Sequence, residues 1–146
     1  MRKDKITGIV LADIHFGVID AVKLYKELSG IVTEFLRSKE SLDVIFIAGD
    51  FFDHILYLNE AHAKYASMFM DDLLREAKRL GAKMRLIYGT ESHECDQYSI
   101  FTSKFLNSPI DVRVIKTVEE EELFDNYDVL YLPEEYIYNK HVHYSK

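Results

Sequence analysis

Short, continuous runs of apolar residues alternate along this chain with segments whose apolar residues recur at helical spacing. The runs are rich in β-branched residues, as is typical of strands buried on both faces, and they read KITGIVLAD (5–13), DVIFIAGD (43–50) and KMRLIYG (83–89). Helical spacing extends over residues 20–39 and about 59–80, where Gly81 is suited to end the second helix as its C-cap. Alternation of this kind predicts an α/β domain.

The second half of the chain continues the pattern with shorter elements. A short helix is expected at 95–106, and two further strands are expected at DVRVI (111–115) and DVLYLP (128–133). The acidic run EEEE at 119–122 is interpreted as a solvated surface segment. The expected order is therefore βαβαβαββ, which predicts an α/β domain with helices flanking a sheet.

Length, composition and charge limit the class of protein. The 146 residues suffice for one domain with a sizeable core, and 48% hydrophobic with 29% charged residues is the profile of a globular protein. No apolar run approaches the roughly 20 residues that span a bilayer, and no secretory signal is recognisable. No membrane partner is therefore expected. Because Cys95 is the only cysteine, a reducing, cytoplasmic location is expected. The net charge of −7 argues against holding nucleic acid over a broad basic surface, although divalent metals can supply positive charge locally.

Polar clusters follow each of the first three predicted strands. In chain order they are Asp13 with His15, Asp50 with Asp53, and His93 within 91–94. Because the carboxyl ends of neighbouring parallel strands meet at one edge of an open α/β sheet, we expect the three clusters to lie close together. Carboxylates combined with neutral imidazoles are ligands for Mn²⁺, Fe²⁺ or Zn²⁺. The sequence therefore predicts a metal site at this edge.

The residue types suggest a division of labour within that site. Side chains two apart in an extended segment point to the same side, so Asp13 and His15 can hold one ion, whereas D-x-H on its own is more typical of a turn. Asp50 can bridge two ions with its two oxygens, and two ions together polarise a phosphoryl group and produce a hydroxide nucleophile near neutral pH. Asp53 is expected either to fix the loop or a ligand histidine from behind, or to N-cap the following segment.

The combined pattern D-x-H … G-D-x-x-D … G-x-x-x-H-E, over roughly residues 6–135, resembles the first three motifs of the calcineurin-like metallophosphoesterases. The wording ADIHFG and AGDFFDH is most similar to the nuclease subunit of the SbcC–SbcD type of double-strand-break repair nuclease. The resemblance implies a four-layer α/β/β/α sandwich and hydrolysis of phosphodiester bonds by a two-metal site. Mn²⁺ is the usual metal, with Mg²⁺, Fe²⁺ or Zn²⁺ as alternatives.

The resemblance also implies an SbcC-like ATPase partner and a homodimer formed through helices. The predicted helix from about Asn59 lies where such dimer helices are expected, and it carries the apolar residues Met68, Phe69, Leu73 and Leu74. Packing of these residues in the core of the chain itself is an equally good interpretation.

Carried over residue by residue, the resemblance assigns the first metal to Asp13 and His15 and the bridging position to Asp50. His93 matches the family histidine that contacts the phosphate and protonates the leaving oxygen, a role that suits an imidazole with a pKa near 6.5. The family motif has an asparagine ligand before this histidine, whereas this chain reads GTESHE. The replacement for the asparagine is left open between Thr90 and Ser92, with Glu91 as a further oxygen donor.

The chain departs from the family pattern again downstream of His93. The family closes its site with a lone histidine and a Gly-His-x-His turn, but here the next histidines are His141 and His143, without the preceding glycine. We interpret these two residues as part of a tail, with a ligand pair as the alternative. Residues 1–146 are thus expected to form a single metallophosphoesterase domain that is incomplete at its C-terminus and is the N-terminal portion of a longer nuclease.

Three functions are consistent with this pattern. The first is a metal-dependent DNA nuclease, in which the ions activate water against a DNA phosphodiester. The second is a metallophosphoesterase that acts on small substrates rather than DNA, which the acidic net charge favours slightly. The third is a catalytically silent module for dimerisation or partner docking, which the absence of the distal ligands favours.

Overall fold

A four-stranded parallel sheet is the central element of the computed structural model, which describes residues 4–134. The strands lie side by side in chain order, and they are β1 (Gly8–Leu11), β2 (Val44–Ala48), β3 (Lys83–Ile87) and β4 (Val112–Ile115). Val10, Phe46 and Arg85 lie next to one another across three strands, so they share one face of the sheet. The predicted α/β class is confirmed, and β1 is shorter than the apolar run that predicts it.

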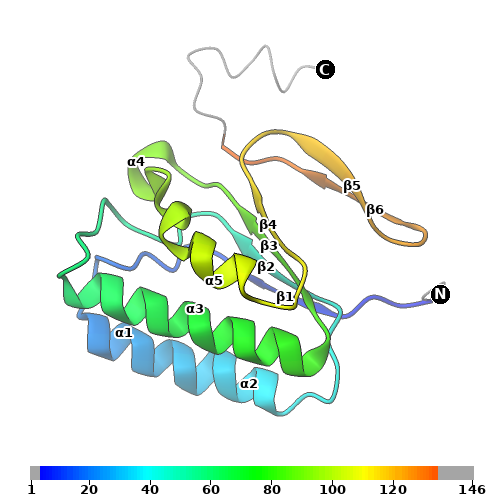
Figure 1. The fold of residues 1–146 in the computed structure, drawn as a ribbon, viewed down its shortest axis with the longest axis horizontal. Helices are drawn as coiled ribbons and strands as arrows, with labels where there is room; N and C mark the ends of the chain where they lie inside the picture. Colours follow the sequence, from blue (N-terminus) through cyan, green and yellow to red (C-terminus); the bar gives the residue numbers. More distant parts are fainter. Residues whose placement is uncertain (1–3, 135–146) are drawn as a thin grey trace.

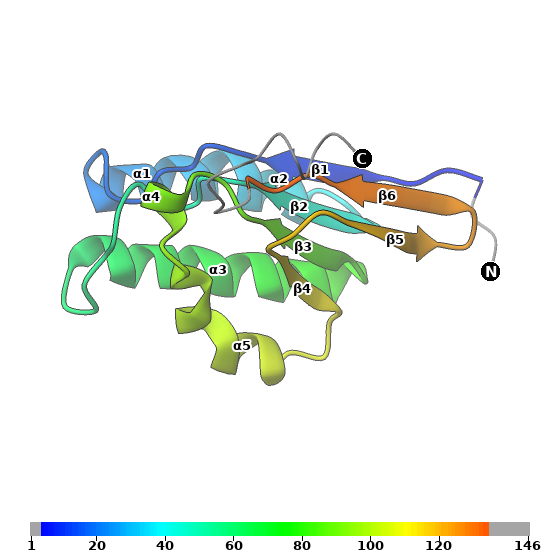
Figure 2. The same ribbon diagram turned by 90° about the horizontal axis from the view of Figure 1, so that it is seen from above.

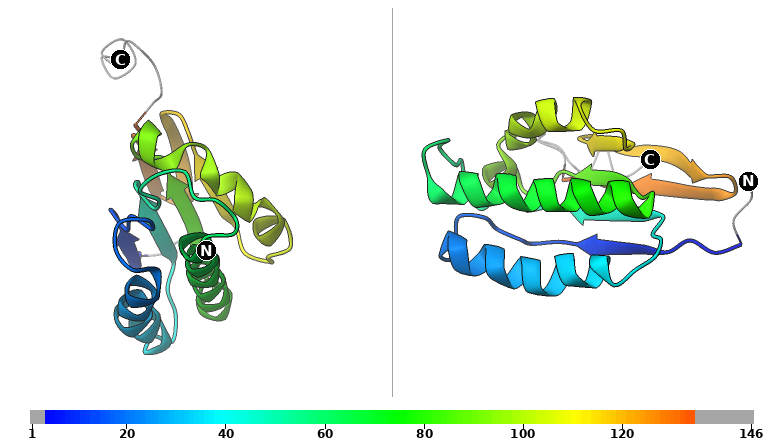
Figure 3. Two further views of the ribbon diagram at one scale, coloured as in Figure 1. Left: turned by 90° about the vertical axis from the view of Figure 1, so that its left-hand side faces the viewer. Right: turned by 60° about the horizontal axis from the view of Figure 1, so that its bottom comes forward.

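Helices connect the parallel strands, because the chain must cross back to the start of the sheet before each new parallel strand. These helices cover one face of the sheet (Figures 1 and 2). After β1 come α1 (Ala21–Leu28), the π-helical segment η1 (Ser29–Thr33) and α2 (Glu34–Arg37); after β2 comes α3 (Ala61–Leu80); after β3 come α4 (Glu91–Glu94), the 3₁₀-helix η2 (Gln97–Phe101) and α5 (Thr102–Leu106). The antiparallel hairpin of β5 (Glu119–Phe124) and β6 (Tyr127–Tyr131) lies on the other face (Figure 3).

The structure contains the helix caps that the sequence indicates, but two of the predicted helices are not regular α-helices throughout. Asp20 N-caps α1 by accepting a hydrogen bond from the Lys23 N–H at 2.8 Å, and Gly81 ends α3 with a φ of 73°. The helix expected over 20–39 is interrupted by the π-helical turn that contains Gly30, a residue with low helix propensity. The helix expected over 95–106 begins as a 3₁₀-helix and becomes α-helical only at Thr102.

The hydrophobic core lies between the sheet and the helices. Its fully buried members include Ile45, Ile47, Met84 and Leu86 from the strands and Phe69 and Leu73 from α3. Phe69, Leu73 and the buried Leu74 therefore pack inside the chain, so their apolar character does not by itself indicate a dimer surface. Among residues 4–134, no helix has both the length and the apolar character needed to cross a membrane.

The interpretation of the acidic run as a solvated surface segment is correct only for Glu120 and Glu122. Residues 119–122 form most of β5, an additional strand that pairs with β6. Glu120 and Glu122 face solvent, whereas Glu119 and Glu121 are half-buried on the opposite side of the strand. Alternation between two faces is the signature of a strand, and four identical residues conceal it in the sequence.

Arg85 is the reason that a glutamate of β5 faces inward. Its side chain is completely buried in β3, and its guanidinium donates to the two oxygens of Glu121 at 2.7 and 2.8 Å and to Asp111 at 2.8 and 3.2 Å. The Tyr131 hydroxyl completes the group by donating to Glu121 at 2.7 Å. A buried charge is tolerated only when it is paired, so this ion-pair group fixes the hairpin to the sheet.

The face of the sheet opposite the helices is covered only in part by the hairpin. Val10 of β1 is 67% exposed there, and an open apolar groove of about 510 Å³ runs between β1–β3 and β6. The described residues thus form one helical layer, one parallel sheet and a hairpin on the second face. A second helical layer, which the four-layer sandwich requires, does not occur within residues 4–134.

The ion pair with Arg85 makes the stability of the fold dependent on pH. The hydrogen bond from Arg85 lowers the pKa of Glu121 to about 2 in the folded chain, from an ordinary value of 4.5. Because the pKa of Glu121 is lower in the folded chain than in the unfolded chain, its charge stabilises the fold at pH values above the unfolded pKa. This stabilisation is lost as the pH falls toward about 2. Glu121→Gln is expected to reduce the free energy of unfolding at neutral pH and to flatten its decline between about pH 4.5 and about pH 2. Urea unfolding of wild type, Glu121→Gln and the exposed control Glu120→Gln measures this, and identical pH curves for all three would contradict it.

Candidate metal centre

The loops that follow β1, β2 and β3 meet at the carboxyl edge of the sheet, where the sequence predicts the site. The first two loops run side by side, because the His15 N–H donates to the Asp50 carbonyl at 3.0 Å and the Phe16 N–H donates to the Phe51 carbonyl at 2.9 Å. The third loop joins them through the Thr90 N–H, which donates to Asp50 Oδ1 at 2.7 Å. The edge therefore gathers all three predicted clusters.

Three of the predicted ligand residues have an unusual backbone conformation. Asp13, His15 and Asp50 have φ values of 52°, 53° and 51°, in the left-handed region that non-glycine residues rarely adopt. The expectation that Asp13 and His15 lie in an extended segment is therefore wrong, although their side chains still approach each other. Residues held in such conformations cost free energy and occur preferentially at functional sites.

An imidazole nitrogen of His15 lies near two carboxylates. His15 Nε2 is 3.8 Å from Asp13 Oδ1 and 3.9 Å from Asp50 Oδ2, distances too long for hydrogen bonds. The Asp13 side chain is 75% exposed and that of Asp50 only 16%, so Asp13 lies on the solvent side of the cluster. This nitrogen faces two carboxylate oxygens without a hydrogen bond to either of them.

His93 approaches the same carboxylate from the third loop. Its Nδ1 is 3.2 Å from Asp50 Oδ2, and its ring meets the His15 ring edge-on with centroids 4.9 Å apart. His15, Asp50 and His93 each offer a ligand atom, and these three atoms lie within 4.8 Å of one another.

The donor set of this cluster fits a divalent cation. Two imidazoles and a carboxylate suit a borderline ion such as Mn²⁺, Fe²⁺ or Zn²⁺. The buried Nδ1 of His93, 3.2 Å from Asp50 Oδ2, has no hydrogen-bond partner among the described residues, and a cation at this position would satisfy it. The His15 Nδ1 also lacks a hydrogen-bond partner there, but it faces Asp53 rather than the cluster.

The third motif places one of its three uncertain residues beside Asp50. Thr90 donates its N–H to Oδ1, and its hydroxyl lies 3.3 Å from Oδ2. Glu91 and Ser92 are exposed in α4 instead. Thr90 is thus the residue that corresponds in space to a ligand next to Asp50. His141 and His143 lie outside the described residues.

Two glycines allow the loops after β2 and β3 to approach this closely. A Cβ on Gly89 would lie 2.2 Å from Asp50 Oδ1 and 2.4 Å from the Asp50 nitrogen, distances that no side chain tolerates. A Cβ on Gly49, whose φ is 84°, would lie 3.0 Å from the Gly89 Cα. The position of Asp50 therefore depends on the absence of side chains at both residues.

Asp53 lies behind His15, as one of its two predicted roles requires. Its Oδ1 is 3.4 Å from His15 Nδ1, and its Oδ2 is 2.9 Å from His54 Nδ1. The hydrogen bond with His54 lowers the pKa of Asp53, which keeps its carboxylate charged. The alternative role is wrong, because Glu60 rather than Asp53 occupies the N-cap position of α3. Asp53 thus contacts the side of His15 that faces away from Asp50.

Glu94 is a buried acid beneath the site. It is completely buried, and its Oε1 accepts a hydrogen bond from the Phe51 N–H at 3.1 Å. Burial raises the pKa of Glu94 to about 7, so that near neutral pH this carboxyl is only partly ionised. Phe51 directly follows Asp50, so Glu94 helps to hold the backbone that carries the central carboxylate.

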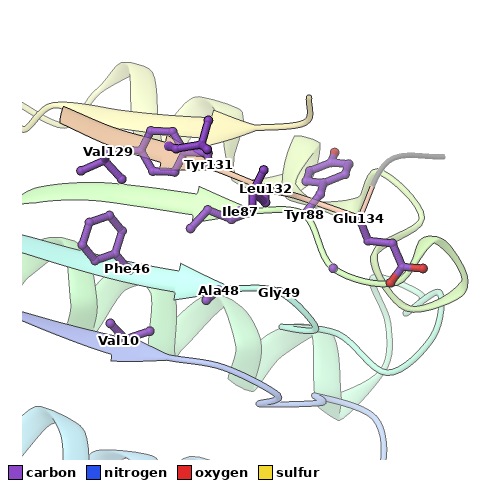
Figure 4. Close-up of a pocket in the computed structure, with 12 residues that line it drawn as sticks. Val10, Phe46, Ala48, Gly49, Ile87, Tyr88, Val129, Tyr131, Leu132 and Glu134 are labelled. Atoms are coloured by element: carbon purple, nitrogen blue, oxygen red, sulfur yellow. The ribbon is translucent and has the colours of Figure 1, made fainter. Parts of the chain in front are cut away.

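Two further side chains contact the site loops although the sequence analysis assigned them no role. Gln97 hydrogen-bonds to both the second and the third loop, and Glu134 Oε2 lies 3.3 Å from the Thr90 hydroxyl. Figure 4 shows Glu134 beyond the end of β3, next to the loop that follows Tyr88. No motif spacing marks either residue, because the contacts of Gln97 with the second loop and of Glu134 with Thr90 each span more than 40 positions of the chain.

Comparisons with known proteins do not add to this description. No protein-family model matches the chain, and no curated protein matches it significantly. The assignment of a function therefore depends on the motif residues and on the geometry that brings them together.

Gly89→Ala tests the close approach of the two loops. The added Cβ must displace Asp50, so we expect the free energy of unfolding to fall by about 1–3 kcal/mol, as for other overpacked sites. Gly30→Ala is the matched control, because no atom lies within 4 Å of its added Cβ, and it is expected to stabilise the helical segment by about 0.5–1 kcal/mol. Urea unfolding measures both, and a Gly89→Ala protein as stable as wild type would contradict the account.

Proposed function

We propose that this chain is a metal-dependent phosphodiesterase of the calcineurin-like metallophosphoesterase type, and that its substrate is DNA. The observation that carries the proposal is the convergence of His15, Asp50 and His93 within 4.8 Å at the carboxyl edge of a parallel sheet. That edge is where open α/β sheets bind their ligands. The order of the motifs in the sequence, D-x-H before G-D-x-x-D before S-H-E, supports the same family.

The ligand roles follow from the positions of the side chains. Asp13, His15 and Asp50 would hold Mn²⁺, and Asp50 is the best placed to contact two ions because both of its oxygens face the third loop or the imidazoles. Bound divalent ions polarise a phosphoryl group and lower the pKa of a water molecule. Asp53 lies behind the His15 ring with its Oδ1 3.4 Å from Nδ1, the position from which a carboxylate would orient a histidine ligand.

His93 is the proposed proton donor. Its Nδ1 lies 3.2 Å from Asp50 Oδ2, which leaves Nε2 as the nitrogen for a phosphate or leaving-group oxygen. A histidine can hold or release a proton near neutral pH, which suits protonation of the leaving oxygen.

The charge of the site requires a cation before a phosphate can approach. Asp13, Asp50 and Asp53 concentrate negative charge at an edge of a chain whose net charge is already −7. A DNA phosphate would be repelled by these groups unless bound metal reverses the local charge. The same net charge favours a second candidate, a metallophosphoesterase for small phosphodiesters, because such a substrate needs no extended basic surface. If the substrate is DNA, we further propose that the chain forms a homodimer and acts with an SbcC-like ATPase partner.

Asp50→Asn tests the metal site directly. Calorimetric titration with Mn²⁺ is expected to give binding tighter than about 1 mM for wild type and affinity at least tenfold weaker for Asp50→Asn, roughly the effect of losing a metal contact. Asp20→Asn is the matched control, because this exposed N-cap tolerates asparagine and lies outside the cluster.

Phosphodiester cleavage distinguishes the candidate functions. With Mn²⁺, wild type and Asp20→Asn are expected to cut labelled DNA, whereas Asp50→Asn is expected to leave it intact. Cleavage of a chromogenic small phosphodiester but not of DNA would support the second candidate. Equal cutting by wild type and Asp50→Asn would contradict both, and the absence of Mn²⁺ binding by wild type would indicate the silent module.

A further inference from the structure

We propose that Gln97 is a positioning residue that fixes His93 relative to the loop carrying Asp50, and thereby sets the metal affinity of the site. The proposal builds on the function proposed above. Two segments are involved, the β2–α3 loop (residues 49–60) and the β3–η2 segment (residues 88–96), which includes α4. Gln97 follows the second segment directly and reaches back to the first.

The side-chain amide of Gln97 makes three hydrogen bonds that link these segments. Its Oε1 accepts from the Leu56 N–H at 2.7 Å, and its Nε2 donates to the His54 carbonyl at 2.8 Å and to the His93 carbonyl at 3.2 Å. One group therefore holds the backbone of His93, a member of the cluster, and of His54, which hydrogen-bonds to Asp53. Gln97 is only 7% exposed, so water competes little for these bonds.

Only a side-chain amide of this length satisfies all three backbone groups. Two donors and an acceptor are needed at once, and an amide supplies two N–H groups and one carbonyl oxygen. A carboxylate keeps the acceptor but has no donor for the two carbonyls, and an apolar side chain provides neither. Removing the amide would leave buried backbone groups without these partners, which is costly.

The turn that places Gln97 is itself fixed to the sheet. Cys95 and Asp96, which precede it, both have positive φ values, so the chain reverses direction between α4 and η2. The Asp96 carboxylate accepts hydrogen bonds from the Tyr88 hydroxyl and from Lys116 Nζ, which ties this turn to the ends of β3 and β4. Gln97 thus has a rigid base from which to hold His93.

Two other side chains also link the segments and would remain in a Gln97 variant. Asp50 accepts from the Thr90 N–H, and Glu94 accepts from the Phe51 N–H. Both act at the start of the β2–α3 loop, whereas Gln97 acts at His54 and Leu56, further along it. A Gln97 variant is therefore expected to fold while the position of His93 relative to His54 becomes less defined.

Gln97→Met tests the proposal because methionine has a similar length and lacks all three hydrogen bonds. Mn²⁺ affinity measured by calorimetry is expected to fall about tenfold, the lower end of the range for residues that support metal ligands. In the metal-free protein, hydrogen exchange of the Leu56 amide is expected to accelerate, while exchange of the Thr90 amide, which Asp50 protects, stays as in wild type.

Gln97→Glu separates the donor role from the acceptor role. Its carboxylate retains an acceptor for Leu56, so protection of the Leu56 amide is expected to persist. The donors to His54 and His93 are lost, so Mn²⁺ affinity is expected to fall, even though the added negative charge alone would strengthen cation binding.

Leu74→Ala controls for a general loss of stability. This substitution opens a cavity in the core in the second half of α3, about 20 Å along the helix from its start at the site end of the sheet. It is expected to lower the melting temperature without changing Mn²⁺ affinity. Unchanged affinity in Gln97→Met, or an equal loss in Leu74→Ala, would overturn the positioning role.

Failure of the proposed function gives a different result. If wild type binds no Mn²⁺, the metal site itself is refuted, and with it the effect of Gln97 on affinity, whatever the exchange data show. If wild type binds Mn²⁺ and Gln97→Met binds it equally well with Leu56 still protected, the proposed function survives and the positioning role does not.

Discussion

The contact between the bare backbones of Gly49 and Gly89 is the constraint on which the candidate site depends. A side chain at either position would force the loops that follow β2 and β3 apart. Here neither residue has a side chain, and a Cβ on Gly89 would overlap the Asp50 carboxylate. Asp50 can therefore accept the Thr90 N–H and stand beside His93, which the third loop carries. Strain at three positive-φ residues is tolerated because backbone hydrogen bonds between the loops hold them in place.

Among the described residues, charged groups are paired around Arg85 beneath the hairpin but not fully paired at the carboxyl edge of the parallel sheet. At the hairpin, every acidic group around the buried Arg85 has a cationic or hydroxyl partner, so the ion-pair group is complete within the described residues. At the carboxyl edge, carboxylates and imidazoles face one another at 3.2 to 3.9 Å, and the buried Nδ1 of His93, next to Asp50, has no hydrogen-bond partner among residues 4–134. The first arrangement stabilises a fold, whereas the second is expected of a site that binds a cation.

Apolar periodicity predicts the parallel strands and α3, because burial in a layered α/β fold dictates which positions are apolar. The convergence of the clusters follows from the same reasoning, since parallel strands bring their ends to one edge. The sequence conceals β5, because burial of Glu121 depends on an arginine 36 positions earlier in the chain. Gln97 and Glu134 are equally hidden, because they contact the site through loop conformations that no spacing rule describes. The turned backbone at Asp13 and His15 also escapes prediction, since it depends on hydrogen bonds to the neighbouring loop.

The most direct test is the anomalous X-ray signal of Mn²⁺ in crystals of the chain grown or soaked with this ion. A peak is expected about 2.0–2.3 Å from Asp50 Oδ2 and from an imidazole nitrogen of His15, with His93 next to it. A second peak on the Thr90 side of Asp50 would indicate a two-metal centre. Crystals at saturating Mn²⁺ with no peak at this edge, or with the ion bound only elsewhere, would contradict the central claim that these loops form a cation site.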